Sequence, residues 1–226
     1  MENLIFTNTT LLRIYRCEKS FYLNLRYPEL KEEVGESKYS VLERRKIVAK
    51  LMKHLFPNGK YAGIDITGSC ELSNLRTKEL LSSSSQTIFN ACLKHEELYC
   101  FADVLHKENG RWSTFGIWED KDKRSSIYLT ATYQRYIMQQ NGINAGSYYS
   151  IVYHPNRENK DRIDLSYVLI TLDDQIKYLH NNLILLLEKA RRIVKQGKIP
   201  EVRQGKHCTY PQNCEFINYC KFSDKK

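Results

Sequence analysis

The alternation of apolar and polar residues divides the first third of the chain into helical segments. Residues 7–27 place apolar side chains such as Leu11 and Leu23 at helical spacing, after a Thr- and Asn-rich start that suits a helix cap. The same pattern predicts a second helix over residues 41–55, which the sequence FPNGK ends, and a shorter helix over residues 71–81. This part of the chain is therefore expected to be helical.

The middle of the chain has the pattern of β-strands. Residues 97–107 and 111–120 are rich in aromatic and β-branched side chains, and the intervening Asn109-Gly110 is typical of a hairpin turn. The expected elements that follow are a helix over residues 128–142 ended by Gly142, strands over residues 147–154 and 165–172, and a long helix over residues 173–198 capped by Asp173. The pattern thus alternates between helices and strands.

This order predicts an α/β or α+β protein with a central mixed sheet of about four or five strands flanked by helices. We expect a single domain over residues 1–226. Its expected parts are N-terminal helices over residues 1–60, a sheet core over 86–172, a long helix over 173–200 and a cysteine-rich tail over 205–222.

Composition narrows the class of protein. Apolar residues make up 42% of the chain and aromatic residues 12%, which is enough for a hydrophobic core. No apolar run approaches the length of a membrane span, and the N-terminus lacks the features of a signal peptide, so we expect a cytoplasmic protein without membrane contact. In the cytoplasm, seven cysteines, an odd number, favour metal ligation over a disulfide framework.

The charge indicates the chemistry of a partner. Thirty-five basic and 26 acidic residues give a net charge of +9, which favours a polyanion such as nucleic acid, in particular DNA. The charged residues are dispersed along the chain, so they indicate a class of partner but do not locate a binding surface.

Three cysteines are concentrated near the C-terminus, in HCTYPQNCEFINYC. Cys208, Cys214 and Cys220 have the spacing Cys-x5-Cys-x5-Cys, whereas a tetrahedral metal site or a cubane cluster usually has four protein ligands. Cys17 lies between Arg16 and Lys19, where a thiolate is favoured, so it is a candidate fourth ligand and equally a free cysteine. The remaining cysteines are expected to be small buried hydrophobic residues; they are Cys70, Cys92 and Cys100.

The segments RCEKSFYL and GKHCTYPQNCEFINYC resemble the split iron–sulfur module of some RecB-like PD-(D/E)XK nucleases. That group includes the AddB helicase–nuclease subunit, the CRISPR-adaptation exonucleases and a family of uncharacterised bacterial proteins. One cysteine precedes the nuclease core in this group and three follow it. The resemblance implies a restriction-endonuclease-like core and a 4Fe–4S cluster; the implied ligands are Cys17, Cys208, Cys214 and Cys220. Zn²⁺ on the same thiolates, or with His207 replacing one, is the alternative.

The resemblance also implies a catalytic centre. Such nucleases bind Mg²⁺ or Mn²⁺ between an Asp on one strand and the Glu of a Glu-x-Lys on its neighbour, and the Lys assists attack by water. Asp103, Glu119 and Lys121 occur in this order, with Asp103 and Glu119 as the metal ligands. Gln134 resembles the Gln that follows the core, and Glu43 is the candidate acidic residue of the early helix. This order favours an active deoxyribonuclease acting on single strands or ends.

The hairpin register provides the opposing interpretation. If Asn109-Gly110 is a two-residue turn, Asp103 lies opposite Gly116, and the Glu and Lys positions fall on Gly116 and Trp118. A longer loop or a bulge would instead bring Glu119 into place.

Two functions therefore stay open. The first is an iron–sulfur DNA nuclease of DNA repair, defence or mobile-element processing, which works with a partner such as a helicase or a defence-system component. The second is a catalytically degenerate, cluster-stabilised domain that binds nucleic acid or a partner protein.

Overall fold

The structure is a computed structural model of the 226-residue chain. It describes residues 5–32, 38–63, 69–120, 122, 124–154, 166–210 and 213–223. The chain divides into two compact units, which are described separately. The first, called the sheet unit, comprises Met1–Asn8 and Glu43–Leu183, and the second, called the cysteine unit, comprises Thr9–Leu42 and Ile184–Lys226.

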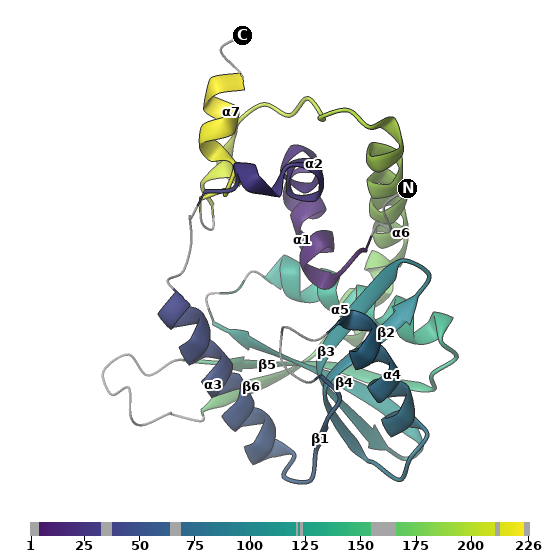
Figure 1. The fold of residues 1–226 in the computed structure, drawn as a ribbon. Coiled ribbons are helices and arrows are strands. Elements are labelled where there is room, and N and C mark those ends of the chain that lie inside the picture. Colours follow the sequence, from purple (N-terminus) through teal and green to yellow (C-terminus); the bar gives the residue numbers. More distant parts are fainter. Residues whose placement is uncertain are drawn as a thin grey trace. The chain divides into compact units, whose positions relative to one another are not determined.

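The sheet unit contains a mixed sheet of six strands in the described part of the chain, ordered β1-β2-β3-β4-β5-β6 (Figure 1). The strands are β1 (Lys60–Tyr61), β2 (Thr87–His95), β3 (Leu98–Glu108), β4 (Arg111–Glu119), β5 (Ala145–Tyr153) and β6 (Tyr167–Thr171). The β1–β2 and β4–β5 pairs are parallel and the others are antiparallel. A mixed sheet flanked by helices confirms the predicted fold class, with more strands than expected.

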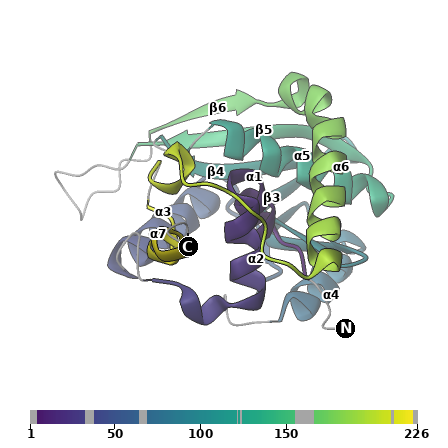
Figure 2. The same ribbon diagram turned by 90° about the horizontal axis from the view of Figure 1, so that it is seen from above.

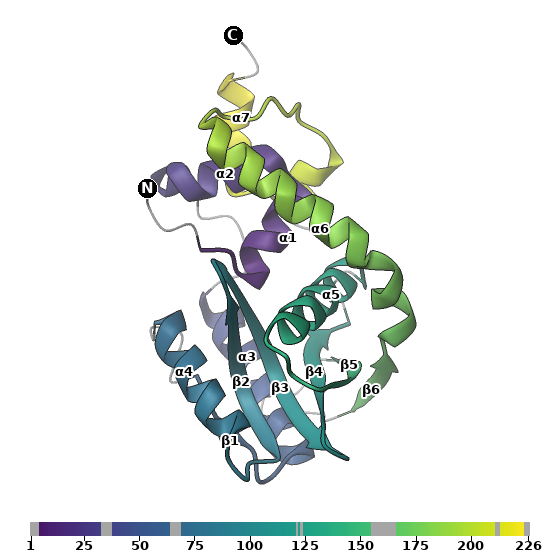
Figure 3. The same cartoon turned by 90° about the vertical axis from the view of Figure 1, so that its right-hand side faces the viewer.

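Helices cover both faces of this sheet. The helices are α3 (Lys38–Leu55), α4 (Cys70–Leu81), α5 (Arg124–Gln140) and the first half of α6 (Asp173–Gln196). Leu51 and Met52 of α3 pack on Val104, Ile117 and Ile151, which form a buried cluster in the middle of the sheet. Figure 3 shows α5 on the opposite side of the sheet from α3.

The β3–β4 hairpin has the short turn that the sequence indicates. Glu108 pairs with Arg111, so Asn109 and Gly110 alone form the connection. Their φ angles are 49° and 76°, the left-handed region that a type I′ turn requires at both positions. This turn fixes the strand register, which continues to the pair of Val104 and Phe115.

One strand was not predicted, and one expectation about local structure was wrong. Residues 87–95 form β2, which was not predicted because both faces of this strand are largely buried and its apolar residues do not alternate. Asp173 is the first residue of α6 rather than its cap, and its carboxylate accepts a hydrogen bond from the backbone N–H of Tyr148 at 3.0 Å. The carboxylate therefore links α6 to β5.

The cysteine unit joins segments that lie far apart in the sequence. It contains α1 (Asn8–Arg16) from Thr9 onward, α2 (Glu18–Arg26), the 3-10 helices η1 (Pro28–Leu30) and η2 (Lys206–Cys208), the second half of α6, and α7 (Ile217–Ser223). Leu23 of α2 packs on Phe216 and Cys214 of the tail. Figure 2 shows this unit from above. No helix in the described ranges is both long enough and apolar enough to cross a membrane.

The single helix expected over residues 7–27 is interrupted. Cys17 has φ −164° and ψ 120°, an extended conformation that ends α1 and precedes α2. Its sulfur accepts a hydrogen bond from the backbone N–H of Ser20, so Cys17 is the N-cap of α2. Helical spacing of the apolar residues continues through this break, which is why the pattern did not reveal it.

Candidate functional site

The helix break positions the first candidate cluster ligand. The Cys17 sulfur lies 3.5 Å from the backbone nitrogen of Ser20, at the N-terminal end of α2. Burial raises the pKa of Cys17, while hydrogen bonds from the backbone N–H groups of Ser20 and Lys19 oppose that rise. The helix end therefore provides donors and a partial positive charge that suit a thiolate.

The three tail cysteines are buried, with exposed fractions of 7% for Cys208, 8% for Cys214 and 9% for Cys220. The backbone N–H of Cys214 donates to the carbonyl of Cys208 at 2.7 Å. Burial raises the pKa of Cys220 to about 11, Lys19 opposes the rise, and the thiols of Cys214, Cys17 and Cys208 add to it. The four predicted ligands thus lie close enough to influence one another electrostatically.

Basic residues of the N-terminal helices hold this tail. Arg13 forms an ion pair with Glu215 at 2.6 Å, and its guanidinium lies 6.0 Å from the ring centre of Phe216. The Nε of Arg16 donates to the backbone carbonyl of His207 at 2.7 Å. The tail is therefore fixed beside Cys17 by contacts that are independent of any bound group.

The two candidate metal groups require different spacings between the thiols. Within the residues that the structure describes, no three His, Cys, Asp or Glu side chains are placed to hold a single metal ion. Tetrahedral Zn²⁺ with Zn–S bonds of about 2.3 Å would bring its thiolates to about 3.8 Å from one another. In a cubane each thiolate binds a different iron, so the sulfurs lie farther apart. An all-thiol donor set in a buried setting fits such a cluster, which stays a prediction.

The remaining three cysteines belong to the sheet unit. Cys92 and Cys100 are buried, and burial raises the pKa of Cys92 to about 12. Cys70 is half-buried as the first residue of α4. Cys92 and Cys100 are the small buried hydrophobic residues that were expected, and Cys70 is more exposed than expected.

Asp103 lies where the described pairing of β3 and β4 ends. Its carboxylate Oδ2 accepts a hydrogen bond from the backbone N–H of Ile117 at 2.7 Å. Burial raises the pKa of Asp103, and this hydrogen bond and the charge of Arg44 oppose the rise. The next position along β4 after the Val104–Phe115 pair is Gly116, so the register brings Gly116 opposite Asp103.

The indole of Trp118 fills the space beside Gly116. A Cβ at position 116 would lie 2.6 Å from the indole Nε1 of Trp118, closer than real Cβ contacts allow. Residues two apart on a strand share a face, so Gly116 and Trp118 lie on the same side of β4. The Glu and Lys positions of the nuclease pattern therefore fall on Gly116 and Trp118. Neither side chain has a carboxylate or an amine.

Glu119 occupies a different environment. It is 7% exposed and ends β4 next to Tyr153 of β5. Strand alternation places it on the face of Ile117, opposite to that of Trp118. Its backbone N–H donates to the carboxylate of Asp122 at 2.9 Å.

Arg44 of α3 contributes a positive charge to this region. It forms an ion pair with Asp122 at 2.5 Å. Burial lowers the pKa of Arg44, but the carboxylate of Asp122 outweighs it, with smaller contributions from Tyr153 and Glu119, so the pKa is raised on balance. Sequence reasoning missed Arg44 and Asp122. Arg44 and Asp122 are 78 positions apart, so no local sequence pattern indicates that they pair. The position of Arg44 next to the candidate Glu43 was the one indication that the sequence offered.

Of the other predicted catalytic residues, Glu43 and Gln134 have recorded contacts with groups other than Asp103. Glu43 forms an ion pair with Lys46 at 2.9 Å, within α3. The Gln134 amide donates to the backbone carbonyl of Phe101 at 2.9 Å, which links α5 to β3. Lys121 lies outside the described residues. The catalytic roles of all three stay predictions.

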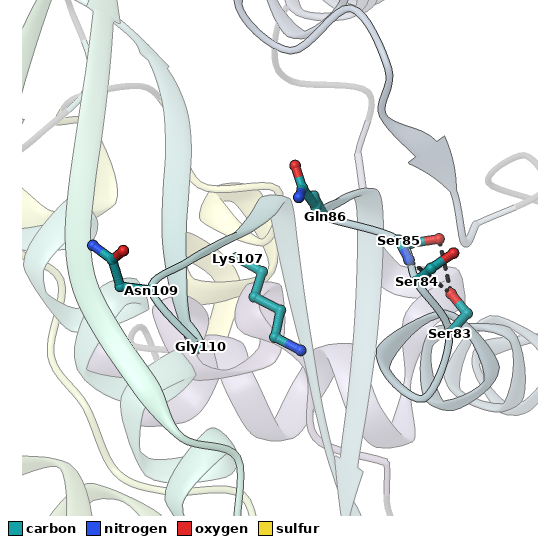
Figure 4. Close-up of a pocket in the computed structure, with 7 residues that line it drawn as sticks. All are labelled: Ser83, Ser84, Ser85, Gln86, Lys107, Asn109 and Gly110. Atoms are coloured by element: carbon teal, nitrogen blue, oxygen red, sulfur yellow. Dashed lines mark hydrogen bonds between the residues drawn. The ribbon is translucent and has the colours of Figure 1, made fainter.

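A polar pocket lies at the tip of the β3–β4 hairpin. It has a volume of about 280 Å³, and its lining residues are Ser83, Ser84, Ser85, Gln86, Lys107, Asn109 and Gly110. Figure 4 shows the serines on one side, Asn109 on the other and Lys107 between them. The ammonium of Lys107 lies 5.6 Å from the ring centre of Trp112. The lining includes a cation and hydroxyl donors without a carboxylate, which suits an anionic group.

Comparisons with solved structures give distant matches. No protein-family model and no curated protein sequence matches the chain. The crystal structure of SSO0001 is similar to 99% of this chain and 86% of its own, with 14% identity and a TM-score of 0.42. A protein from Eubacterium rectale, provisionally described as an exonuclease, is similar over 89% of this chain and 79% of its own, with 11% identity and a TM-score of 0.33. Both TM-scores are too low to establish a common fold.

Proposed function

We propose that this chain is a nuclease-like, nucleic-acid-binding protein whose catalytic centre is not assembled and whose cysteine unit holds a 4Fe–4S cluster. The observation that carries the proposal is the indole of Trp118, which occupies the space beside Gly116, opposite Asp103. In an active PD-(D/E)XK centre this position would carry the second metal-binding carboxylate.

Asp103 is poorly suited to bind a metal ion by itself. Divalent cations in nucleases are held by at least two oxygen ligands that converge from one side. The Asp103 carboxylate is already bonded to the backbone of Ile117, and burial favours its protonated form. Glu119 is directed to the other face of the sheet, so it does not supply the missing oxygen.

The cluster has a structural role in this proposal. Cys17, Cys208, Cys214 and Cys220 would hold it, and the cluster would supply covalent iron–sulfur bonds between the first helices and the tail. Residues 16 and 207, which contact each other, are 191 positions apart. Closing a loop of this length lowers the entropy of the unfolded chain and thereby stabilises the folded unit.

Nucleic-acid binding is supported by charge and by the polar pocket. The chain carries a net charge of +9, and the pocket with Lys107 offers an ammonium and hydroxyl groups to a phosphate. DNA is the preferred partner, as in the nucleases that the cysteine pattern resembles, and a helicase or a defence-system protein remains a predicted protein partner.

One observation favours an active metal-dependent DNA nuclease as the second candidate. Arg44 influences both Asp103 and Glu119 electrostatically, so the two carboxylates are not remote from each other. In this candidate function Mg²⁺ or Mn²⁺ would be held between Asp103 and Glu119.

The test is cleavage of labelled single- and double-stranded DNA by anaerobically purified protein with added Mn²⁺. The proposal expects binding without cleavage, and equal results for the intact protein and Asp103→Ala. Cleavage that is lost in Asp103→Ala and in Glu119→Gln would instead establish the nuclease.

A further inference from the structure

One stretch of the cysteine unit is strongly basic. Residues 189–206, called the basic segment, contain seven lysines and arginines and one acidic residue, so their net charge is +6. The segment covers the end of α6 and the connection from α6 to α7, which Figure 1 shows. Its exposed cations are Arg191, Arg192, Lys195, Lys198, Arg203 and Lys206.

The packing of α6 presents its cations outward. Leu187, Ala190 and Ile193 form the buried face of the second half of the helix. Arg192 and Lys195 lie on the opposite face and are exposed. Because the apolar face is already buried in the protein, it is not available to insert into a lipid surface. The exposed face therefore suits a polyanion in solution better than a membrane.

The connection continues this exposed charge beyond the helix. Gly197, with φ 64°, follows the last residue of α6 and turns the chain out of the helix. The side-chain amide of Gln204 donates to the backbone carbonyl of Ile217 at 3.1 Å, which ties the connection to α7. Lys198 and Arg203 lie between these two points and are exposed. The backbone that carries them is thus anchored at both ends.

Helix stability explains only part of this charge. A lysine in the last turn of a helix interacts favourably with the helix dipole, which accounts for Lys195. Lys198 and Arg203 lie beyond the end of the helix, so the dipole does not account for them. Neighbouring like charges repel one another and lower stability. A bound polyanion would relieve this repulsion.

Helix α3 is a comparable basic element of the sheet unit. Among its described side chains, the exposed lysines and arginines are Arg45, Lys46, Lys50 and Lys53. The ammonium of Lys46 is paired with Glu43 at 2.9 Å. The basic segment has six exposed cations against these four, so it is the stronger candidate for contact with a polyanion.

We propose that the basic segment binds the phosphate backbone of a nucleic acid. The inference rests on the proposed function, because it assigns nucleic-acid binding to the cysteine unit in addition to the pocket of the sheet unit. Lysine and arginine contact phosphates whatever the base, so this binding is independent of sequence and weakens as the salt concentration rises.

The first variants change the charge of the basic segment in the full chain. Glu188 is one turn before Arg192 on the exposed face of α6, so the substitutions are placed farther along. The neutral variant combines Lys195→Gln, Lys198→Gln and Arg203→Gln, all at exposed positions. The charge-retaining variant combines Lys195→Arg, Lys198→Arg and Arg203→Lys.

The matched control removes the same charge from α3. It combines Arg45→Gln, Lys50→Gln and Lys53→Gln, which are also exposed. The control and the neutral variant each lose one arginine and two lysines, so both change the net charge from +9 to +6. Fluorescence anisotropy with labelled single-stranded and duplex oligonucleotides of random sequence gives the affinity of each protein at several salt concentrations. The two oligonucleotides distinguish the two forms of the phosphate backbone.

The expected result is a loss of binding that depends on where the charge is removed. The neutral variant should bind about tenfold more weakly than the intact protein, and its salt slope should fall by about two to three. The α3 control and the charge-retaining variant should stay within about twofold of the intact protein.

Three outcomes would overturn the inference while nucleic-acid binding itself stands. They are equal weakening in the neutral variant and the α3 control, equal weakening in the neutral and charge-retaining variants, and unchanged binding by the neutral variant. If the neutral variant instead loses binding to phosphatidylserine vesicles and keeps its affinity for both oligonucleotides, the segment binds lipid and the inference is wrong. An intact protein that binds neither oligonucleotide at low salt overturns the inference together with the nucleic-acid binding of the proposed function.

Discussion

The backbone N–H of Ile117 donates to the carboxylate of Asp103 at 2.7 Å, at the point where the described pairing of β3 and β4 ends. A backbone donor that would otherwise face the neighbouring strand is thus satisfied by a side chain. The carboxylate of Asp103 in β3 thus bonds to the backbone of β4. Asp103 is therefore tied to the backbone of the neighbouring strand.

Two substitutions should complete a metal site. Gly116→Glu combined with Trp118→Lys removes the indole that a Cβ at position 116 would contact and supplies the Glu-x-Lys beside Asp103. We expect Mn²⁺-dependent DNA cleavage by the double variant, above the background of the intact protein by orders of magnitude. Gly116→Glu alone should fold less stably because Trp118 must move. Cleavage by the intact protein at the rate of the double variant would contradict this prediction.

The cluster itself can be measured directly. Protein purified without oxygen should contain about four irons per chain and absorb broadly in the visible range. Cys17→Ser should lose iron and loosen the tail, because Cys17 would be the ligand that the N-terminal helices contribute in the proposed function. Cys70→Ser, at a half-buried cysteine of the sheet unit, is the matched control and should retain full iron. Iron loss in both variants, or zinc in the intact protein, would count against the assignment.

DNA binding should depend strongly on salt. If Lys and Arg side chains displace counterions from the DNA phosphates, the logarithm of the association constant falls linearly with the logarithm of the salt concentration. Lys107→Ala should weaken binding and reduce that slope by about one, whereas Lys53→Ala, at an exposed position of α3, should change it less. Fluorescence anisotropy with a labelled oligonucleotide measures both. An affinity that stays constant as salt rises would exclude this mode of binding.

Asp103 should make stability depend on pH. Its pKa is raised in the folded state, so its contribution is fully present below the ordinary Asp value and is lost as pH rises through the raised value. Asp103→Asn should therefore have a larger free energy of unfolding than the intact protein at pH 7. The difference should vanish near pH 3, where the carboxyl is protonated in both the folded and the unfolded chain.

The measurement for this prediction is urea unfolding followed by tryptophan fluorescence. Both tryptophans, Trp112 and Trp118, belong to β4, so the signal reports on the sheet unit. A stability difference that is the same at pH 7 and at pH 3 would show that the carboxylate does not titrate as expected.

The sequence predicted features that local rules determine. Asn109-Gly110 specified the type I′ turn, and the turn specified the register that brings Gly116 opposite Asp103. The break at Cys17 was not predictable, because the apolar spacing of a helix continues on both sides of it. The pairing of Arg44 with Asp122 was not predictable either, since it depends on where α3 packs against the end of β4.

The joining of distant segments in the cysteine unit has a consequence for biosynthesis. Arg16 and His207 contact each other across 191 positions, so the ribosome exposes Cys17 long before its partners exist. The α1–α2 segment must remain without its packing partner until synthesis reaches α7. The cysteine unit can therefore assemble only after translation has passed Cys220. In a prematurely terminated chain the apolar residues of α1 and α2 would stay exposed, and proteases could recognise them.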